Sequence, residues 1–216
     1  MAIDYRITLD DAHEFSYRIE LDREYDAQAA SLAPKWTRLE YQQCSNCPLS
    51  KDNFSHCPAA VDLHRVIEDF HGLPAFKKVV VWVQTPEREY SKQVGLEEGL
   101  RSLLGVIMAT SACPMLGRLK PMAHNHLPFA SSHEFALRAV SLYLTQQYFN
   151  FREGRPADWE LKGLVAQFQQ LQLVNQAFWQ RIHDTCEGDS NLKAFLTFFS
   201  MSSSMTYSLQ TQLQKI

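Results

Sequence analysis

Cysteines beside prolines form the motif with the clearest chemical potential in this chain. Cys44 and Cys47 form a C-x2-C pair followed by Pro48, and Cys57 stands directly before Pro58. A tight turn between two cysteines points both sulfurs the same way, which suits a tetrahedral zinc ion or one edge of an iron–sulfur cluster. Proline is favoured at the first position of a helix, so the Cys57 sulfur is expected at a helix N-terminus, where the helix dipole and free N–H groups favour a thiolate.

Three cysteines leave one position of a tetrahedral site unfilled. Cys113 is the first candidate, because it lies in the segment 111–129, which its prolines and glycine predict to be a long loop and whose length a shared metal would explain. His126 and His124, in the same segment, are the reserve ligands. His56 ranks below them, because two adjacent residues rarely ligate one metal. The predicted metal site is therefore Cys44, Cys47, Cys57 and Cys113.

Zinc is the cofactor that this arrangement favours, and an iron–sulfur cluster is the alternative. Each of Cys47, Cys57 and Cys113 precedes a proline, and one ferredoxin motif ends in Cys-Pro. A third possibility is a set of reduced, buried cysteines without a metal. A redox-active C-x2-C ranks last, because Pro48 follows the pair and the surrounding elements do not indicate a βαβ unit.

Composition narrows the classes of protein. The 216 residues are 45% hydrophobic and 21% charged, values typical of a globular chain. The 21 Lys and Arg against 24 Asp and Glu form no basic block, and no apolar stretch reaches the length of a membrane-spanning helix, so neither nucleic acid nor a membrane is an expected partner. The first residues do not resemble a signal peptide, so the protein is expected to be cytoplasmic. Five cysteines, including a remote Cys186 interpreted as a packing or free thiol, argue against a disulfide framework.

The elements that would position the cysteines alternate between strand and helix patterns in the first half. Strict alternation of apolar and polar residues predicts two strands, 3–9 and 15–21, joined as a hairpin. A third strand is predicted just before the cysteines, a helix just after Cys57, and a second hairpin beyond that helix; their ranges are 36–41, 58–70, 78–83 and 90–94.

Helical patterns dominate the second half. A helix is predicted over 96–110, and a capping box at Ser131 and Glu134 begins another that runs to about residue 152. Further helices are predicted from Asp158 onward and over 191–214. The fold class is therefore α+β: an N-terminal antiparallel sheet with one helix (1–95), followed by a C-terminal helical bundle (96–216), both within one compact unit.

Four short segments together resemble a bacterial family of domains of unknown function. They are QCSNCPL at 43–49, HCP at 56–58, MATSACP at 108–114 and HLPFAS at 126–131. The resemblance covers most of the chain. It implies a bacterial origin and a site built from Cys44, Cys47, Cys57 and Cys113, and it supplies no substrate.

These observations favour a metal-stabilised accessory or regulatory protein with no assigned catalytic residue. The chain holds no G-x-S-x-G, H-E-x-x-H, phosphate-loop or dinucleotide-binding fingerprint. Two alternatives stay open. One is an iron–sulfur or metal-dependent enzyme with His124 or His126 near an open coordination position. The other is a helical scaffold that forms a homodimer through its C-terminal helices, whose glutamine-rich, lightly charged face motivates this hypothesis.

Overall fold

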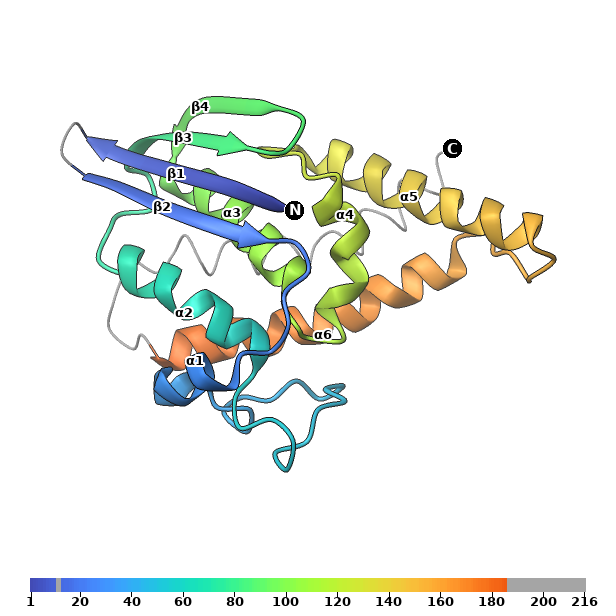
Figure 1. Ribbon diagram of the computed structural model, residues 1–216, viewed down its shortest axis with the longest axis horizontal. Coiled ribbons are helices and arrows are strands. Elements are labelled where there is room, and N and C mark those ends of the chain that lie inside the picture. The colour runs from blue at the N-terminus through green and yellow to red at the C-terminus, as the bar shows by residue number, and fades with distance from the viewer. Residues whose placement is uncertain (11–12, 186–216) are drawn as a thin grey trace.

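The computed structural model describes residues 1–10 and 13–185. Two hairpins, β1 (Ala2–Asp10) with β2 (His13–Glu20) and β3 (Lys78–Gln84) with β4 (Glu89–Gly95), form one antiparallel sheet with the strand order β2-β1-β3-β4 (Figure 1). The predicted N-terminal sheet and the central position of the strand at 78–83 are confirmed.

One face of the sheet is buried and the other is largely open. Along β1, Ile3, Tyr5 and Ile7 are buried, as the period-two alternation predicts. On the opposite face the guanidinium of Arg6 lies 3.8 Å from the ring centroid of Trp82, which is the neighbouring residue on β3. The alternation in sequence therefore reports which side chains face the core.

Two helices, α2 (Pro58–Phe70) and α3 (Leu96–Thr110), pack beneath the sheet (Figure 1). Helix α3 crosses the sheet closely at Gly99, where an added Cβ would lie 2.8 Å from Cγ2 of Val81. A residue with a side chain would clash with β3 here, which explains why this position is a glycine. The predicted helices at 58–70 and 96–110 are confirmed at both ends.

The predicted strand at 36–41 is wrong. After α1 (Ala27–Leu32), the chain forms the 3-10 turn η1 (Lys35–Thr37), and a single bridge between Arg38 and His56 replaces a ladder. The reason is tertiary: the buried guanidinium of Arg181 binds the carbonyl oxygens of three residues in this segment, Trp36, Arg38 and Leu39. Those carbonyls are not available to a neighbouring strand.

The segment 111–129 is not a continuous loop, contrary to the prediction. It contains η2 (Leu116–Leu119) and the short helix α4 (Lys120–His124). Pro121 lies in the first turn of α4, where a backbone N–H is not needed, so proline there starts a helix and does not break one. The capping box at Ser131 and Glu134 is confirmed and begins α5 (Ser132–Arg152).

The last described helix is α6 (Lys162–Thr185), which begins four residues later than predicted from Asp158. Between Asp158 and the start of α6, Leu161 adopts a positive φ of 60°. The Asp158 carboxylate accepts a hydrogen bond from the Gly163 N–H at 2.6 Å. The helices α5 and α6 form a V whose tip projects from the rest of the molecule (Figure 1). The predicted helix at 191–214 and Cys186 lie outside the described residues.

Three aromatic side chains near the tip of this V are exposed: Tyr148, Phe149 and Phe151. They lie on the last turns of α5, beyond the reach of the core. Tyr143 is half-buried against the hydrophobic core and donates a hydrogen bond to Asp158 at 2.9 Å.

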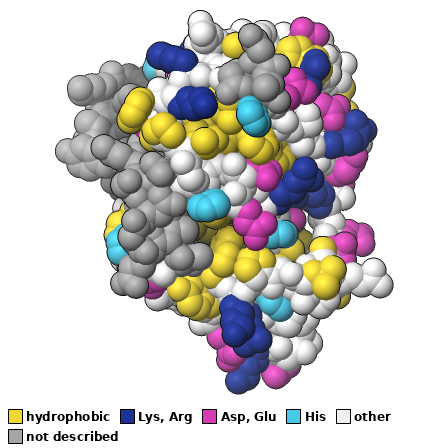
Figure 2. All heavy atoms as spheres, turned by 90° about the vertical axis from the view of Figure 1, so that its left-hand side faces the viewer, with side chains coloured by type: hydrophobic (Ala, Val, Ile, Leu, Met, Phe, Trp, Pro, Cys, Tyr) yellow, Lys and Arg dark blue, Asp and Glu magenta, His cyan; other side chains and the backbone are white. Residues whose placement is uncertain are grey.

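The core is one hydrophobic cluster that draws buried residues from both halves of the chain, from Ile3 on β1 to Ile182 on α6. On the molecular face in Figure 2, cationic and anionic side chains intermix with hydrophobic ones. Within residues 1–10 and 13–185, no helix is both long and apolar enough to cross a bilayer. The boundary between 1–95 and 96–216 stays a prediction, and the core extends across it.

Candidate metal centre

A loop closed at its base carries Cys44 and Cys47. Two backbone hydrogen bonds close it: the Leu39 N–H donates to the Ser55 carbonyl at 3.1 Å, and the Cys57 N–H donates to the Thr37 carbonyl at 2.8 Å. The Cys47 N–H donates to the Cys44 carbonyl at 3.0 Å, which forms the tight turn that the C-x2-C spacing predicts. Both cysteines are half-buried and pack against the core.

Side chains on this loop fasten it to α6. Nδ2 of Asn46, between the two cysteines, donates to both the backbone carbonyl and the side-chain oxygen of Gln170, at 3.0 Å each. Nε2 of Gln42 donates to the Asp184 carboxylate at 2.6 Å. The loop therefore lies on a helix more than a hundred residues away in the chain, although it has little regular structure of its own.

Cys57 is the N-cap residue of α2, with Pro58 following as the first helical residue, as predicted. The backbone N–H groups of Ala59 and Ala60, in the first helical turn, favour the thiolate form of Cys57. Burial nevertheless raises the pKa of the Cys57 thiol, because the desolvation of a thiolate outweighs these donors. The Cys57 side chain is therefore a buried thiol.

Cys113 lies just past α3 and is arranged in the same way. Its sulfur accepts backbone hydrogen bonds from Leu116 and Met115, and its own N–H donates to Oγ of Ser111 at 3.3 Å. Burial raises the pKa of the Cys113 thiol to about 11. Both buried cysteines thus direct their sulfurs at the backbone N–H groups of the following turn.

The four cysteines act on one another electrostatically although they come from separate parts of the chain. Burial raises the pKa of Cys44 to about 12, and the neighbouring sulfurs of Cys57, Cys113 and Cys47 contribute in that order. All four are free thiols. The structure thus brings Cys113 into the electrostatic range of the loop cysteines; we call these four residues the cysteine cluster. As the side chains stand, the described part of the chain holds no group of three or more His, Cys, Asp or Glu residues that could hold a metal ion.

A buried cation adjoins the cysteine cluster. Arg181 of α6 is 2% exposed, and its Nη1 donates to the carbonyls of Trp36 and Arg38 at 2.5 and 2.8 Å. Cys57 and Cys44 are the groups that most favour its charged form, while burial lowers the pKa of the guanidinium. A positive charge therefore faces sulfurs that would become negative on losing their protons.

The reserve ligands lie elsewhere. Nε2 of His126 is 2.5 Å from the hydroxyl of Tyr5, and Nε2 of His124 is 3.8 Å from the Asp22 carboxylate. His56 is exposed and forms a hydrogen bond to Oγ of Ser55 at 2.9 Å. None of these three histidines is among the groups that shift the pKa values of Cys44, Cys57 or Cys113.

Sequence reasoning missed Arg181. The signal was present in α6, because Val174, Phe178 and Arg181 follow one another at helical spacing and the first two are buried. A charged residue that continues an apolar stripe has to find partners in the interior. The helix was predicted from the sequence, but the arginine on its apolar face was overlooked.

The four side chains offer sulfur, the donor type that zinc and iron sites use. Soft sulfur donors suit zinc or iron, and the thiolates that bind such an ion carry negative charge that nearby N–H groups and a cation stabilise. A zinc ion with four thiolates has a net charge of about −2, which Arg181 would partly offset.

Residues 3–216 match the model of a family described as a domain of unknown function, DUF6901. The comparisons found no matching curated protein and no matching solved structure.

Proposed function

The chain belongs to the DUF6901 family of domains of unknown function, and from this premise we propose that it is an accessory or regulatory protein whose fold is stabilised by one zinc ion bound to the cysteine cluster. The observation that carries the proposal is the electrostatic proximity of four free thiols from three separate segments.

Zinc would replace four thiol protons in the core. Burial disfavours the isolated thiolates at Cys44, Cys57 and Cys113, so a divalent cation is the partner that makes their deprotonation favourable. The proposal requires the ion to draw the four sulfurs to a Zn–S distance of about 2.3 Å. In doing so it would pin the loop over 40–54 onto the end of α3 and beneath α6.

The site supports a structural role over a catalytic one. Four cysteine ligands fill a tetrahedral zinc site and leave no position open for a water molecule or a substrate. Both Cys57 and Cys113 are buried, and Cys44 and Cys47 are half-buried. Because His126 binds Tyr5 and His124 faces Asp22, a metal-dependent enzyme would need a second metal site away from the cysteine cluster.

Elemental analysis of protein purified without chelator tests the proposal. We expect about one zinc per chain in the wild type and a loss of most of it in Cys47→Ser. Cys186→Ser is the matched control, because it removes a thiol from outside the predicted site, and it should retain its zinc. Protein that binds no metal, or that retains zinc in Cys47→Ser, contradicts the proposal.

An iron–sulfur cluster is the second candidate for the same four residues. Backbone N–H groups that point at Cys57 and Cys113 favour it, because such hydrogen bonds to sulfur ligands tune these clusters. A visible spectrum separates the candidates, since a cluster absorbs visible light and zinc does not. Brown protein containing iron in place of zinc would establish the alternative.

Homodimer formation through the C-terminal helices remains a separate proposal. The glutamine-rich face includes Gln167 and Gln170 of α6, and both already form hydrogen bonds within the chain, to Arg118 and to Asn46. Light scattering of the full chain is the test. A mass of 24.9 kDa, that of one chain, would contradict the dimer and leave the zinc proposal unaffected.

A further inference from the structure

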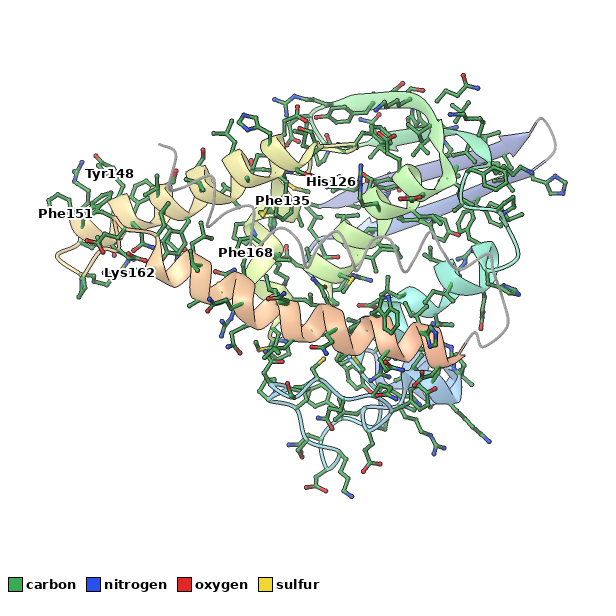
Figure 3. The ribbon with its side chains drawn as sticks, turned by 180° about the vertical axis from the view of Figure 1, so that it is seen from behind. His126, Phe135, Tyr148, Phe151, Lys162 and Phe168 are labelled. Atoms are coloured by element: carbon green, nitrogen blue, oxygen red, sulfur yellow. The ribbon has the colours of Figure 1, made fainter. Side chains whose placement is uncertain are left out.

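A cavity of about 190 Å³ lies between α3, α4, α5 and α6, and Leu116 and Leu119 of η2 also line it. Its walls are mainly apolar, and they include Val106, Leu116, Phe135 and Phe168. The rings of Phe135 and Phe168 meet edge to face, 5.9 Å apart. In Figure 3, His126, Phe135 and Phe168 lie toward the wide end of the V formed by α5 and α6. We call this space the His126 cavity.

One end of the cavity has a buried chain of polar groups. The hydroxyl of Tyr5, on the central strand β1, lies 2.8 Å from Oγ of Ser102 and 2.5 Å from Nε2 of His126. Ser102 Oγ also accepts the Phe129 N–H at 3.4 Å. Tyr5 is fully buried, whereas Ser102 and His126 both line the cavity.

The hydrogen bonds specify where each proton lies. If Ser102 donates to Tyr5, and Tyr5 donates to Nε2 of His126, both hydroxyl protons of this hydrogen-bonded series have an acceptor. In the reverse order, the Ser102 proton would have no acceptor among the described residues. Burial and Arg138 lower the pKa of His126 to about 3, so the imidazole is neutral at physiological pH. A neutral ring that accepts at Nε2 carries its proton on Nδ1, and Nδ1 makes no hydrogen bond to any residue that the structure describes.

A cation stands beside this donor. Arg138 of α5 lines the cavity, and its Nη2 donates to the carbonyls of Met122 and Asn125 at 2.7 and 2.6 Å, which fixes the guanidinium in place. Arg101 is the second cation of the lining, and the described lining residues include no Asp or Glu. The polar end of the cavity therefore presents an N–H donor and positive charge, and the rest of the lining is mainly apolar, with Ser132 and Asn175 as its polar members.

We propose that the His126 cavity binds a small apolar carboxylic acid, with its carboxylate accepting from Nδ1 of His126 beside Arg138 and its hydrocarbon part between Phe135 and Phe168. The volume sets the size. An apolar cavity of about 150 Å³ in another protein accepts benzene, which has six non-hydrogen atoms, so this larger space suits a ligand of roughly eight to ten. Octanoate or a small aryl carboxylate has that size and shape. This inference does not depend on the metal.

Calorimetric titration of the full-length protein with octanoate, octanol and octane-1-sulfonate tests the proposal. We expect octanoate to bind with a Kd on the order of 100 μM, and octanol at least tenfold more weakly because it lacks the negative charge. The sulfonate reports whether the site accepts any anion of this length. Octanol that binds as tightly as octanoate, or no binding of octanoate at millimolar concentration, overturns the proposal.

Three variants locate the ligand. Arg138→Met should weaken octanoate binding about tenfold and leave octanol binding unchanged. His126→Gln should also weaken octanoate, because its amide can accept from Tyr5 but offers no N–H at the Nδ1 position. Ala130→Trp, at a half-buried lining residue, should fill the space and abolish binding of both ligands. Circular dichroism verifies the fold of each variant, and a folded Ala130→Trp that binds octanoate normally contradicts this location.

Discussion

The cysteine cluster and the His126 cavity are two buried polar regions with opposite chemical demands. The cysteine cluster presents sulfur acceptors to backbone N–H groups and to the cation Arg181. The His126 cavity presents an N–H donor and the cation Arg138 to an otherwise apolar space. In our proposals, the first region binds a metal cation through thiolates, whereas the second binds an anion. Burial keeps the thiols protonated and the imidazole neutral, because it raises the pKa of a thiol and lowers the pKa of an imidazole.

The two regions meet at one turn, which makes the comparison testable. The Leu116 N–H donates to the sulfur of Cys113, and Leu116 also lines the His126 cavity. A metal bound by Cys113 would therefore hold one wall of the cavity. The experiments below remove one region at a time and ask whether the other changes.

The largest expected effect is the loss of the metal. Cys47→Ser should lower the melting temperature by about 10 °C, which corresponds to roughly 4 kcal/mol for a chain of this size. Cys186→Ser should melt within about 1 °C of the wild type. Scanning calorimetry with and without EDTA is the measurement, and metal-loaded and chelated proteins that melt together would show that the cysteine cluster stabilises nothing through a metal.

Replacing the buried Arg181 and the half-buried Arg138 separates the two regions next. Arg181→Met leaves the carbonyls of Trp36 and Arg38 without their donor and should cost roughly 3 kcal/mol. Arg138→Met leaves two carbonyls of a more exposed segment and should cost about 1 kcal/mol. Urea unfolding of both variants provides the comparison, and equal losses would argue against a special role for the cation at the cysteine cluster.

Low pH should destabilise the fold at the His126 cavity through protonation of His126. The pKa of His126 falls from 6.5 to about 3 on folding, so between those values the unfolded chain binds a proton that the folded chain excludes. Stability therefore falls as pH decreases, by about 1.4 kcal/mol per pH unit from this residue in the middle of that range.

The variant His126→Gln isolates this contribution. Its stability should decrease less steeply than that of the wild type between pH 6 and about pH 4. Asp62, whose pKa burial raises to about 6, titrates with the opposite sign, but it does so in both proteins and cancels in the difference. Parallel stability curves for the two proteins would show that His126 is not buried as a neutral ring.

The smallest expected effect links the two regions. Removal of the metal should loosen the turn at Leu116 and weaken octanoate binding about fivefold, a coupling of about 1 kcal/mol. The Kd measured with and without EDTA tests this, and Cys47→Ser should reproduce the chelated value without EDTA. An unchanged Kd would mean that the shared turn keeps its shape without the ion.

Much of the fold could be predicted from local patterns. Period-two alternation identified β1 and β2, and the capping box at Ser131 located the start of α5, because both features depend on neighbouring residues. The strand predicted at 36–41 failed because a residue about 140 positions away, Arg181, binds its carbonyls. The prolines of 111–129 indicated a loop, although Pro121 begins a helical turn.

The features of the two candidate sites also fall into those that local sequence predicts and those that depend on distant residues. The C-x2-C turn and the position of Cys57 before a helix follow from adjacent residues, so the sequence by itself determined them. The environment of Cys113 beside Arg181, and the meeting of Tyr5, Ser102 and His126, arise from chain packing between distant elements. Only the tertiary structure decided these, because burial and proximity across the fold set the charge that each group can carry, and a residue's neighbours in sequence do not report either quantity.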